Sequence, residues 1–132
     1  MIPDSFDPFG DELFLVVPPY SQYLRAVRLV AADTAARAGL DCEETEDFRL
    51  AVDELCHTLM SATDHPLFLT FAFTPARVVA RGVARGREGT RPMMSELSET
   101  IVSALADSYE LDKNDGQVEF VVTRRKTKAP KR

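Results

Sequence analysis

The chain has only two cysteines and no long apolar run, and each shortage excludes a class of protein. Cys42 and Cys56 have no second pair, so the sequence indicates neither a disulfide framework nor a zinc-ligand set. No stretch reaches the ~18 consecutive apolar residues of a membrane span, and the acidic start MIPDSFDPFGDE differs from a secretory signal. We therefore expect a soluble cytoplasmic protein with reduced thiols and no membrane partner.

Positive charge is also scarce until the C-terminal end of the chain. The net charge is −5, but the last nine residues, RRKTKAPKR, carry six positive charges and leave the rest near −11. An acidic body argues against a nucleic-acid partner, because nucleic-acid recognition needs a basic patch. The basic segment is interpreted as a solvated, disordered tail in preference to a ligand site.

The length and composition predict one domain. A chain of 132 residues with 45% hydrophobic content is long enough for one core and too short for two ordinary domains. Pro3, Pro8 and Gly10 interrupt residues 1–11, which we predict to be an irregular arm. Residues 12–125 are predicted to form the domain, and residues 126–132 the basic disordered tail.

Apolar periodicity predicts the element order β-α-α-β-β-α-β. Ser21 is the expected cap of the first helix and Gly39 its stop, while Asp41 and Glu44 form a capping box for the second. The expected strands are 12–17, 67–74, 77–84 and 117–123, and the expected helices are 21–38, 41–63 and 95–108. Three helices with one apolar stripe each then cover one face of a mixed, mainly antiparallel four-stranded sheet. The predicted fold class is α+β, a two-layer α/β sandwich.

The second helix carries the most informative pattern in the chain. Its apolar positions recur at three- and four-residue steps from Phe48 onward and form a stripe that must pack on a core. Glu54 and Thr58, four residues apart, share a face beside that stripe. This helix therefore presents one carboxylate and one hydroxyl at the edge of its buried side.

The segment LVVPPYSQYLRAVRLVAADTAARAGLDCEETEDFRLAVDELCHTLM resembles the first half of the anti-sigma factor serine kinases. These belong to the GHKL superfamily of histidine-kinase-like ATPase (Bergerat) domains. The resemblance lies in a strand ending in proline, a helix of the form YLRxVRxxV, a Gly-Leu-Asp connection and a helix reading RLAVDELC. It continues to about Arg125, and it implies the fold of that superfamily.

The resemblance also assigns roles to residues, and several nucleotide-contact positions differ from the family pattern. The family glutamate that acts as general base is matched by Glu54, but the magnesium-holding asparagine four residues later is Thr58. The adenine-binding aspartate of a DxGxG motif aligns with Arg85, which has only donors. Glu96 and Ser98 stand at the phosphate-binding glycine pair, where carboxylates repel a polyphosphate. We interpret Glu54 as a vestigial base in a degenerate nucleotide site.

Two functions are open at this stage. The first is a non-catalytic anti-sigma-factor-like regulator that binds a sigma factor, an anti-anti-sigma (STAS) protein or both, with no cofactor. The alternative is an ATP-dependent serine/threonine kinase that phosphorylates its antagonist, with Glu54 as base, Thr58 as an unusual metal ligand and ATP with magnesium as cofactors. A third, less specific possibility is a stand-alone module of this superfamily that forms a homodimer.

The sequence gives weaker evidence for a partner surface and for the role of the remaining arginines. The resemblance suggests that Arg25 or Arg28, near the start of the first helix, contacts the partner, and both are expected to be exposed. Arg77, Arg81 and Arg85 alternate onto one side of their strand. We interpret them as a solvated strand face in preference to an anion or acidic-partner site.

Overall fold

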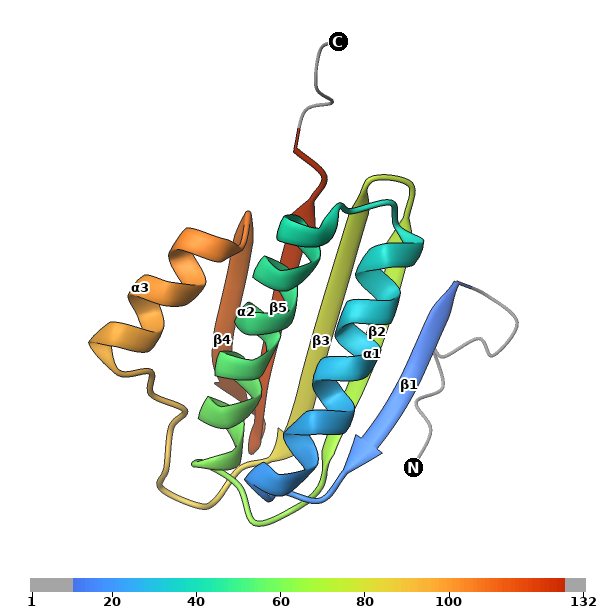
Figure 1. Cartoon of the computed structure of the whole chain (residues 1–132). Coiled ribbons are helices and arrows are strands. Elements are labelled where there is room, and N and C mark those ends of the chain that lie inside the picture. The colour runs from blue at the N-terminus through green and yellow to red at the C-terminus, as the bar shows by residue number, and fades with distance from the viewer. Residues whose placement is uncertain (1–10, 128–132) are drawn as a thin grey trace, which may run out of the picture.

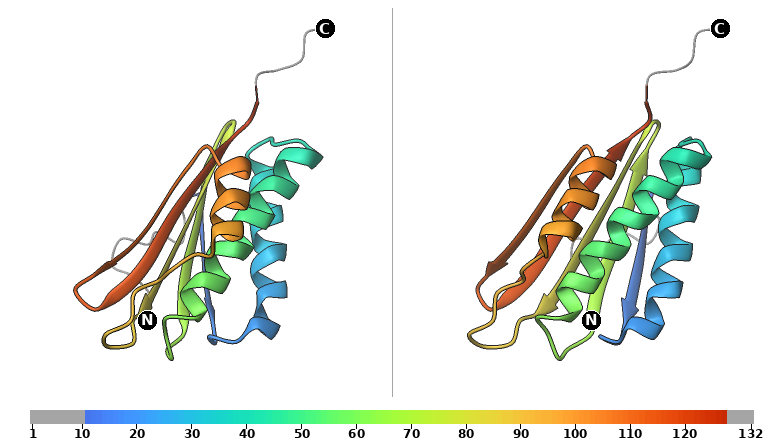
Figure 2. Two further views of the ribbon diagram at one scale, coloured as in Figure 1. Left: turned by 90° about the vertical axis from the view of Figure 1, so that its left-hand side faces the viewer. Right: turned by 60° about the vertical axis from the view of Figure 1, so that its left-hand side comes forward.

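The computed structural model describes residues 11–127, which form two layers (Figure 1). One layer is a sheet, and the helices α1, α2 and α3 cover one of its faces (Figure 2). The elements are β1 Glu12–Val17, the short 3-10 helix η1 Ser21–Tyr23, α1 Leu24–Arg37, α2 Cys42–Met60, β2 Leu67–Thr74, β3 Arg77–Arg85, α3 Glu96–Leu105, β4 Ser108–Asn114 and β5 Gln117–Arg125. The predicted α+β two-layer sandwich is confirmed.

The sheet has five strands in the order β1-β2-β3-β5-β4, and every neighbouring pair within residues 11–127 is antiparallel. The expectation of a mixed four-stranded sheet was therefore wrong in two respects. It missed β4, and it assumed a parallel pair that the sheet does not contain. The hairpins β2–β3 and β4–β5 are local, whereas β1–β2 and β3–β5 join segments that are distant in the sequence.

β4 occupies residues that the periodicity assigned to the end of the third helix. α3 ends at Leu105, because Ala106 leaves the helical region with φ −109° and ψ 151°. β4 then joins β5 through Asp115 and Gly116, which have φ values of 50° and 79°. Two consecutive positive φ values are the signature of a type I′ hairpin turn, so the expected turn at these residues has a strand on each side.

The core lies between the sheet and the helices. Alternate strand residues point inward, and the largest fully buried side chains are those of Phe48, Phe71 and Phe120. Gly82 in β3 makes room for one of these rings, because a Cβ at this position would lie 2.4 Å from Phe120 Cε2. The inward residues of α1 and α2 match the apolar stripes that the sequence predicts.

Of the six predicted helix ends, the stop at Gly39 and the starts at Asp41 and Ser95 agree with the structure, whereas α2 ends at Met60 and not at Thr63. Glu44 N donates to Asp41 Oδ1 at 2.8 Å and Asp41 N donates to Glu44 Oε1 at 2.8 Å, which completes the capping box. Gly39 follows α1 with φ 90°, as expected of a C-terminal stop. The Ser21 prediction was wrong: Ser21 lies in η1, α1 begins after it, and neither helix has a side-chain cap.

Both ends of the described chain are attached to the body. Phe73 N donates to Asp11 O at 3.4 Å, and Lys126 N donates to Ala76 O at 2.8 Å. Thr127 N donates to the Glu44 carboxylate. Residues 1–10 of the predicted arm and 128–132 of the predicted tail lie outside the described residues.

No helix in the described part of the chain has the length and apolar composition that crossing a membrane requires.

Candidate functional site

The candidate site is the junction between α2 and the first turn of α3. Glu54 projects from α2 and is half-buried there. The hydroxyl of Ser98 donates to Glu54 Oε1 at 2.7 Å and joins the two helices. The structure thus brings together two of the residues that the sequence assigned to nucleotide contact, and the contact between them is direct.

Ser98 is held in place by the cap of α3. Ser98 N donates to Ser95 Oγ at 3.0 Å, which is the N-cap bond that starts the helix. The Ser95 hydroxyl donates in turn to Ser98 Oγ at 3.1 Å, so a short relay runs from Ser95 through Ser98 to Glu54. Glu96 and Glu99 add negative charge to the same first turn. The helix N-terminus, which in general attracts anions, is capped and charged by its own side chains.

Thr58 lies one turn along α2 from Glu54 and faces the interior. Its side chain is buried, and its hydroxyl donates to the Glu54 carbonyl oxygen at 3.0 Å. A threonine in the middle of a helix commonly makes this bond to the preceding turn. The hydroxyl proton of Thr58 is therefore used within the helix, and burial restricts access to its oxygen.

The connection between β3 and α3 is fastened at its start by Arg87. The Arg87 guanidinium forms an ion pair with Asp64 at 3.1 Å and donates to the Ser61 and Thr63 carbonyl oxygens at 3.1 and 3.4 Å. Its backbone N–H donates to Ala62 O at 2.8 Å. All of these partners belong to the end of α2 and the connection to β2, so the loop is held against that end of the helix.

A second attachment comes from β4. Lys113 Nζ donates to the carbonyl oxygens of Arg87 and Thr90 at 3.0 and 2.6 Å. Sequence periodicity does not reveal the role of Lys113, because its position depends on β4, whose residues were predicted as helix and loop. The alternation of Tyr109, Leu111 and Lys113 before the Asp115-Gly116 turn was the signal that could have found it.

Arg85 ends β3 away from the Glu54–Ser98 contact. Its side chain is exposed and lines a polar hollow of about 510 Å³. The hollow is lined by Asp64, His65, Arg85, Gly86, Arg87, Glu88, Gly89, Lys113, Asp115 and Gly116. Neither Glu54 nor Ser98 is among these residues, so the expected nucleotide positions fall in two separate places.

The two arginines expected at the partner surface differ in their surroundings. Arg25 is exposed on α1. Arg28 forms an ion pair with Asp53 of α2 at 3.0 Å and is half-buried, so the expectation that both are exposed was wrong for Arg28. Sequence periodicity places Arg28 beside the α1 stripe, but it cannot show that a carboxylate from the neighbouring helix meets it.

Other reactive groups do not add to this site. Cys56 is fully buried, and burial raises the pKa of its thiol, which therefore stays protonated. Cys42 is exposed and free. Within residues 11–127 no three His, Cys, Asp or Glu side chains are grouped so that they could hold a metal ion.

Comparison with known proteins gives a match in fold but not in sequence. No family model matches the chain, and no curated protein matches it in sequence. Among solved structures, the chain is similar to the RsbU and RsbW domains of Rv1364c from Mycobacterium tuberculosis, with a TM-score of 0.67 and 20% identity. The match covers 86% of this chain and 31% of that one, so the chain spans about a third of its structural neighbour.

The fold and the comparison together define the class of structure. Three helices on one face of an antiparallel sheet, in this order along the chain, make the fold that the chain shares with that structure. At 20% identity the likeness concerns the fold alone.

Proposed function

We propose that the chain is an anti-sigma-factor-like regulator that binds its protein partner without using ATP. Its partners on this proposal are a sigma factor, an anti-anti-sigma (STAS) protein or both. The fold likeness to a structure that contains an RsbW domain supports the choice of this regulator class over unrelated two-layer proteins. The choice of a nucleotide-independent member rests on the geometry between α2 and α3.

The observation that carries the proposal is the hydrogen bond between Ser98 and Glu54. In the resembling kinases the equivalent glutamate serves the reaction and the equivalent helix N-terminus receives phosphates. Here the Ser98 hydroxyl donates a hydrogen bond to the Glu54 carboxylate at 2.7 Å, and Glu96 places a further negative charge in the first turn of α3. A nucleotide would have to separate the two side chains and approach two carboxylates, and both steps cost free energy.

The loop before α3 supports the same function. Arg87 and Lys113 hold it to α2 and β4 by bonds that require no ligand. A loop that closes only over bound nucleotide would lose its contacts when the nucleotide leaves. In this chain the protein itself supplies the contacts, so a constant binding surface is expected.

The test is a calorimetric titration of the full chain with ATP and magnesium, together with a thermal melt in each condition. We expect no heat of binding and no shift of the melting temperature. Purified sigma factors and STAS proteins from the organism that encodes the chain are then titrated without ATP, and one of them is expected to bind. Micromolar ATP binding with stabilisation would contradict the proposal and would favour the alternative, an ATP-dependent serine/threonine kinase.

A variant with a restored nucleotide site tests why the parent chain is expected not to bind ATP. The quadruple variant Thr58→Asn, Arg85→Asp, Glu96→Gly and Ser98→Gly restores the family residue at the four positions named in the sequence analysis. If those substitutions are what removed the nucleotide site, the rebuilt chain is expected to gain binding of Mg-ATP. Thr100→Gly is the matched control, because it also adds a glycine to α3 but at an exposed position outside the motif.

A further inference from the structure

β4 forms one edge of the sheet, and an open groove lies beside it. β4 is the last strand in the order β1-β2-β3-β5-β4, on the side of the sheet where α3 lies (Figure 1). The groove has a volume of about 550 Å³ and lies between β4 and the segment that leads into α3. Its walls include Met93, Met94 and Glu99 on one side and Tyr109, Glu110 and Leu111 on the other.

The backbone of β4 is open toward this edge. Asn114 and Gln117 flank the two-residue turn and form a hydrogen-bonded pair, so every second residue back along β4 bonds to β5. Tyr109 and Leu111 therefore direct their N–H and C=O groups away from β5. Within residues 11–127, no backbone–backbone hydrogen bond outside the β4–β5 ladder involves either residue. A further strand has two positions on β4 with which it can pair.

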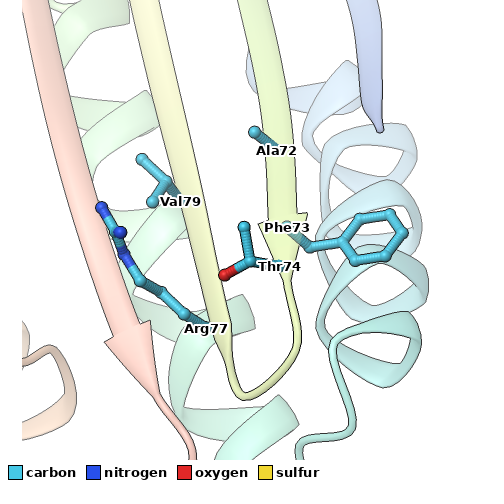
Figure 3. A pocket seen from close by; sticks show the side chains of 5 residues that line it. All are labelled: Ala72, Phe73, Thr74, Arg77 and Val79. Atoms are coloured by element: carbon cyan, nitrogen blue, oxygen red, sulfur yellow. The ribbon is translucent and has the colours of Figure 1, made fainter. Parts of the chain in front are cut away.

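The hollow at the β2–β3 hairpin offers no such edge. It has a volume of about 140 Å³, and Figure 3 shows Ala72, Thr74 and Val79 around it. β2 and β3 each have a strand on both sides, so their backbone groups pair within the sheet. Strand addition is thus available at the groove beside β4 and not at this hollow.

The helix side of β4 is apolar where it faces the groove. Tyr109 and Leu111 lie opposite the buried Val122 and Phe120 of β5, and both are half-buried against the core. Met93, which is 80% exposed, extends the apolar surface across the groove. Methionine side chains adapt to apolar partners of varied shape. The groove therefore suits an apolar side chain of a ligand.

The other side of β4 is acidic. Glu110 and Asp112 alternate with the groove residues and point to the open face of the sheet, while Glu99 stands in the groove wall. Within residues 11–127 none of these carboxylates forms an ion pair, and no lysine or arginine lines the groove. A second copy of β4 would place acidic side chains opposite Glu110 and Asp112, and like charges in this position repel. The charges of β4 therefore disfavour pairing with its own copy and favour a basic strand.

We propose that the groove binds an extended segment of a partner protein, with alternating apolar and basic residues, as an added strand beside β4. Its apolar side chains lie over Tyr109 and Leu111, and its basic side chains lie on the open face beside Glu110. Main-chain hydrogen bonds then supply affinity, and the alternating side chains supply selectivity. Neither Glu54 nor Ser98 lines the groove, so this site does not depend on whether the chain binds ATP.

A synthetic peptide provides the test with the full chain. The probe is a peptide of alternating lysine and valine, about six residues long as in a typical strand, with blocked ends and a fluorescent label. Fluorescence anisotropy is expected to show saturable binding with a Kd below about 1 mM. A peptide with the same residues in two blocks, lysines first and valines second, is the matched control and should bind several-fold more weakly.

Backbone methylation of the peptide tests strand addition directly. An added strand directs the N–H groups of alternate residues toward β4. Methylating the nitrogens of one alternate set should abolish binding, and methylating the other set should leave it within about twofold. The sensitive set is the valines for antiparallel addition and the lysines for parallel addition. Equal effects of the two sets would overturn the proposal.

Variants of the chain locate the peptide. Glu110→Lys is expected to weaken binding by up to about fivefold, the effect of one cross-strand charge pair. Glu43→Lys is the matched control, because it makes the same charge change at an exposed position on α2 outside the groove. Met93→Ser should weaken binding by about threefold or more, whereas Leu97→Ser, at a residue 70% exposed on α3 and outside the groove, should not.

The contrary results are equally specific. Equal loss of affinity in Glu110→Lys and Glu43→Lys would show that the acidic body as a whole attracts the peptide, and it would overturn the proposal. The absence of saturable binding up to about 1 mM would overturn it as well. Far-UV circular dichroism of each variant establishes that a change in affinity is not a loss of fold.

Discussion

The hydrogen bond between Ser98 and Glu54 is the contact whose removal is most informative. Ser98→Ala deletes the donor, and Glu54→Ala deletes the acceptor. Neither change touches the bond from Ser98 N to Ser95 Oγ that caps α3, although Ser98→Ala also removes the oxygen that accepts from the Ser95 hydroxyl. A double-mutant cycle subtracts this second loss and so isolates the link between α2 and α3.

The expected magnitude follows from charge and burial. A hydrogen bond to a charged group contributes about 1.5–3 kcal/mol when it is buried. Both side chains here are half-buried, and solvent screening reduces the value, so we expect a coupling free energy of about 1 kcal/mol. Ser98→Ala alone should lower the free energy of unfolding by about 1–2 kcal/mol, because it also leaves the carboxylate without its partner.

The assay is a double-mutant cycle measured by urea unfolding at neutral pH. The free energies of unfolding of the parent chain, the two single variants and the double variant give the coupling. Thr100→Ala serves as the control: its exposed hydroxyl bonds only to Glu96 O within α3, and the change should stay within about 0.5 kcal/mol. A coupling below about 0.3 kcal/mol, the limit of simple additivity, would refute the reasoning that this bond holds the two helices together.

Three further outcomes are expected. Gly82→Ala should lower the free energy of unfolding by about 1–3 kcal/mol, because the new methyl group overlaps the Phe120 ring in the core. The Glu44 carboxylate should stabilise the fold at neutral pH. The free energy of unfolding should fall by up to about 3 kcal/mol as the pH falls from 4.5 towards 2, and Glu44→Gln should flatten this pH dependence. Arg25→Glu should weaken partner binding at unchanged stability, whereas Arg28→Glu should also lower stability by about 0.5–1 kcal/mol through loss of its ion pair with α2.

Each of these has a specific check. Burial by itself disfavours the Glu44 carboxylate, but bonds from Thr127 and Asp41 and the charge of Arg124 outweigh it and lower the pKa of Glu44 to about 2. Urea unfolding at pH 3 and pH 6 measures the effect, and equal pH slopes for parent and Glu44→Gln would contradict it. For Gly82→Ala, Phe120→Leu should recover part of the loss, and a neutral single variant would show that the core tolerates the methyl group. Calorimetric partner titrations test the arginines, and equal affinity for Arg25→Glu and parent would remove α1 from the interface.

Sequence periodicity was sufficient wherever one face of an element is fully buried. β2 alternates buried and less buried residues from Leu67 to Phe71, and α2 has Phe48 and Leu55 on one buried stripe. β2 was therefore predicted with its observed bounds, and α2 with its observed start but an end beyond Met60. β4 could not be found in this way, because none of its residues is fully buried and it lies at the edge of the sheet. The type I′ turn that follows it was visible in the sequence and implies two strands, which is the stronger signal in such a segment.

The candidate site was only partly predictable for a related reason. Family motifs placed Glu54 and Ser98 on separate elements, and the structure brings them into contact. The attachments made by Arg87 and Lys113 depend on loop geometry and on β4, neither of which has a periodic signal. Contacts of this kind, from a surface side chain to the backbone of a distant segment, become visible only once the strand order is known.

The strand order also has a consequence for how the chain reaches its native state. The β2–β3 hairpin, the β4–β5 hairpin and the α1–α2 pair each join neighbouring segments and can form on the microsecond timescale of local elements. β3 and β5 belong to different hairpins, and their pairing encloses the whole segment that contains α3. Closing that loop costs conformational entropy before packing of the core can offset it. The two long-range pairings, β1 with β2 and β3 with β5, are therefore expected to limit the folding rate, and substitutions along them should slow folding more than those in either hairpin turn.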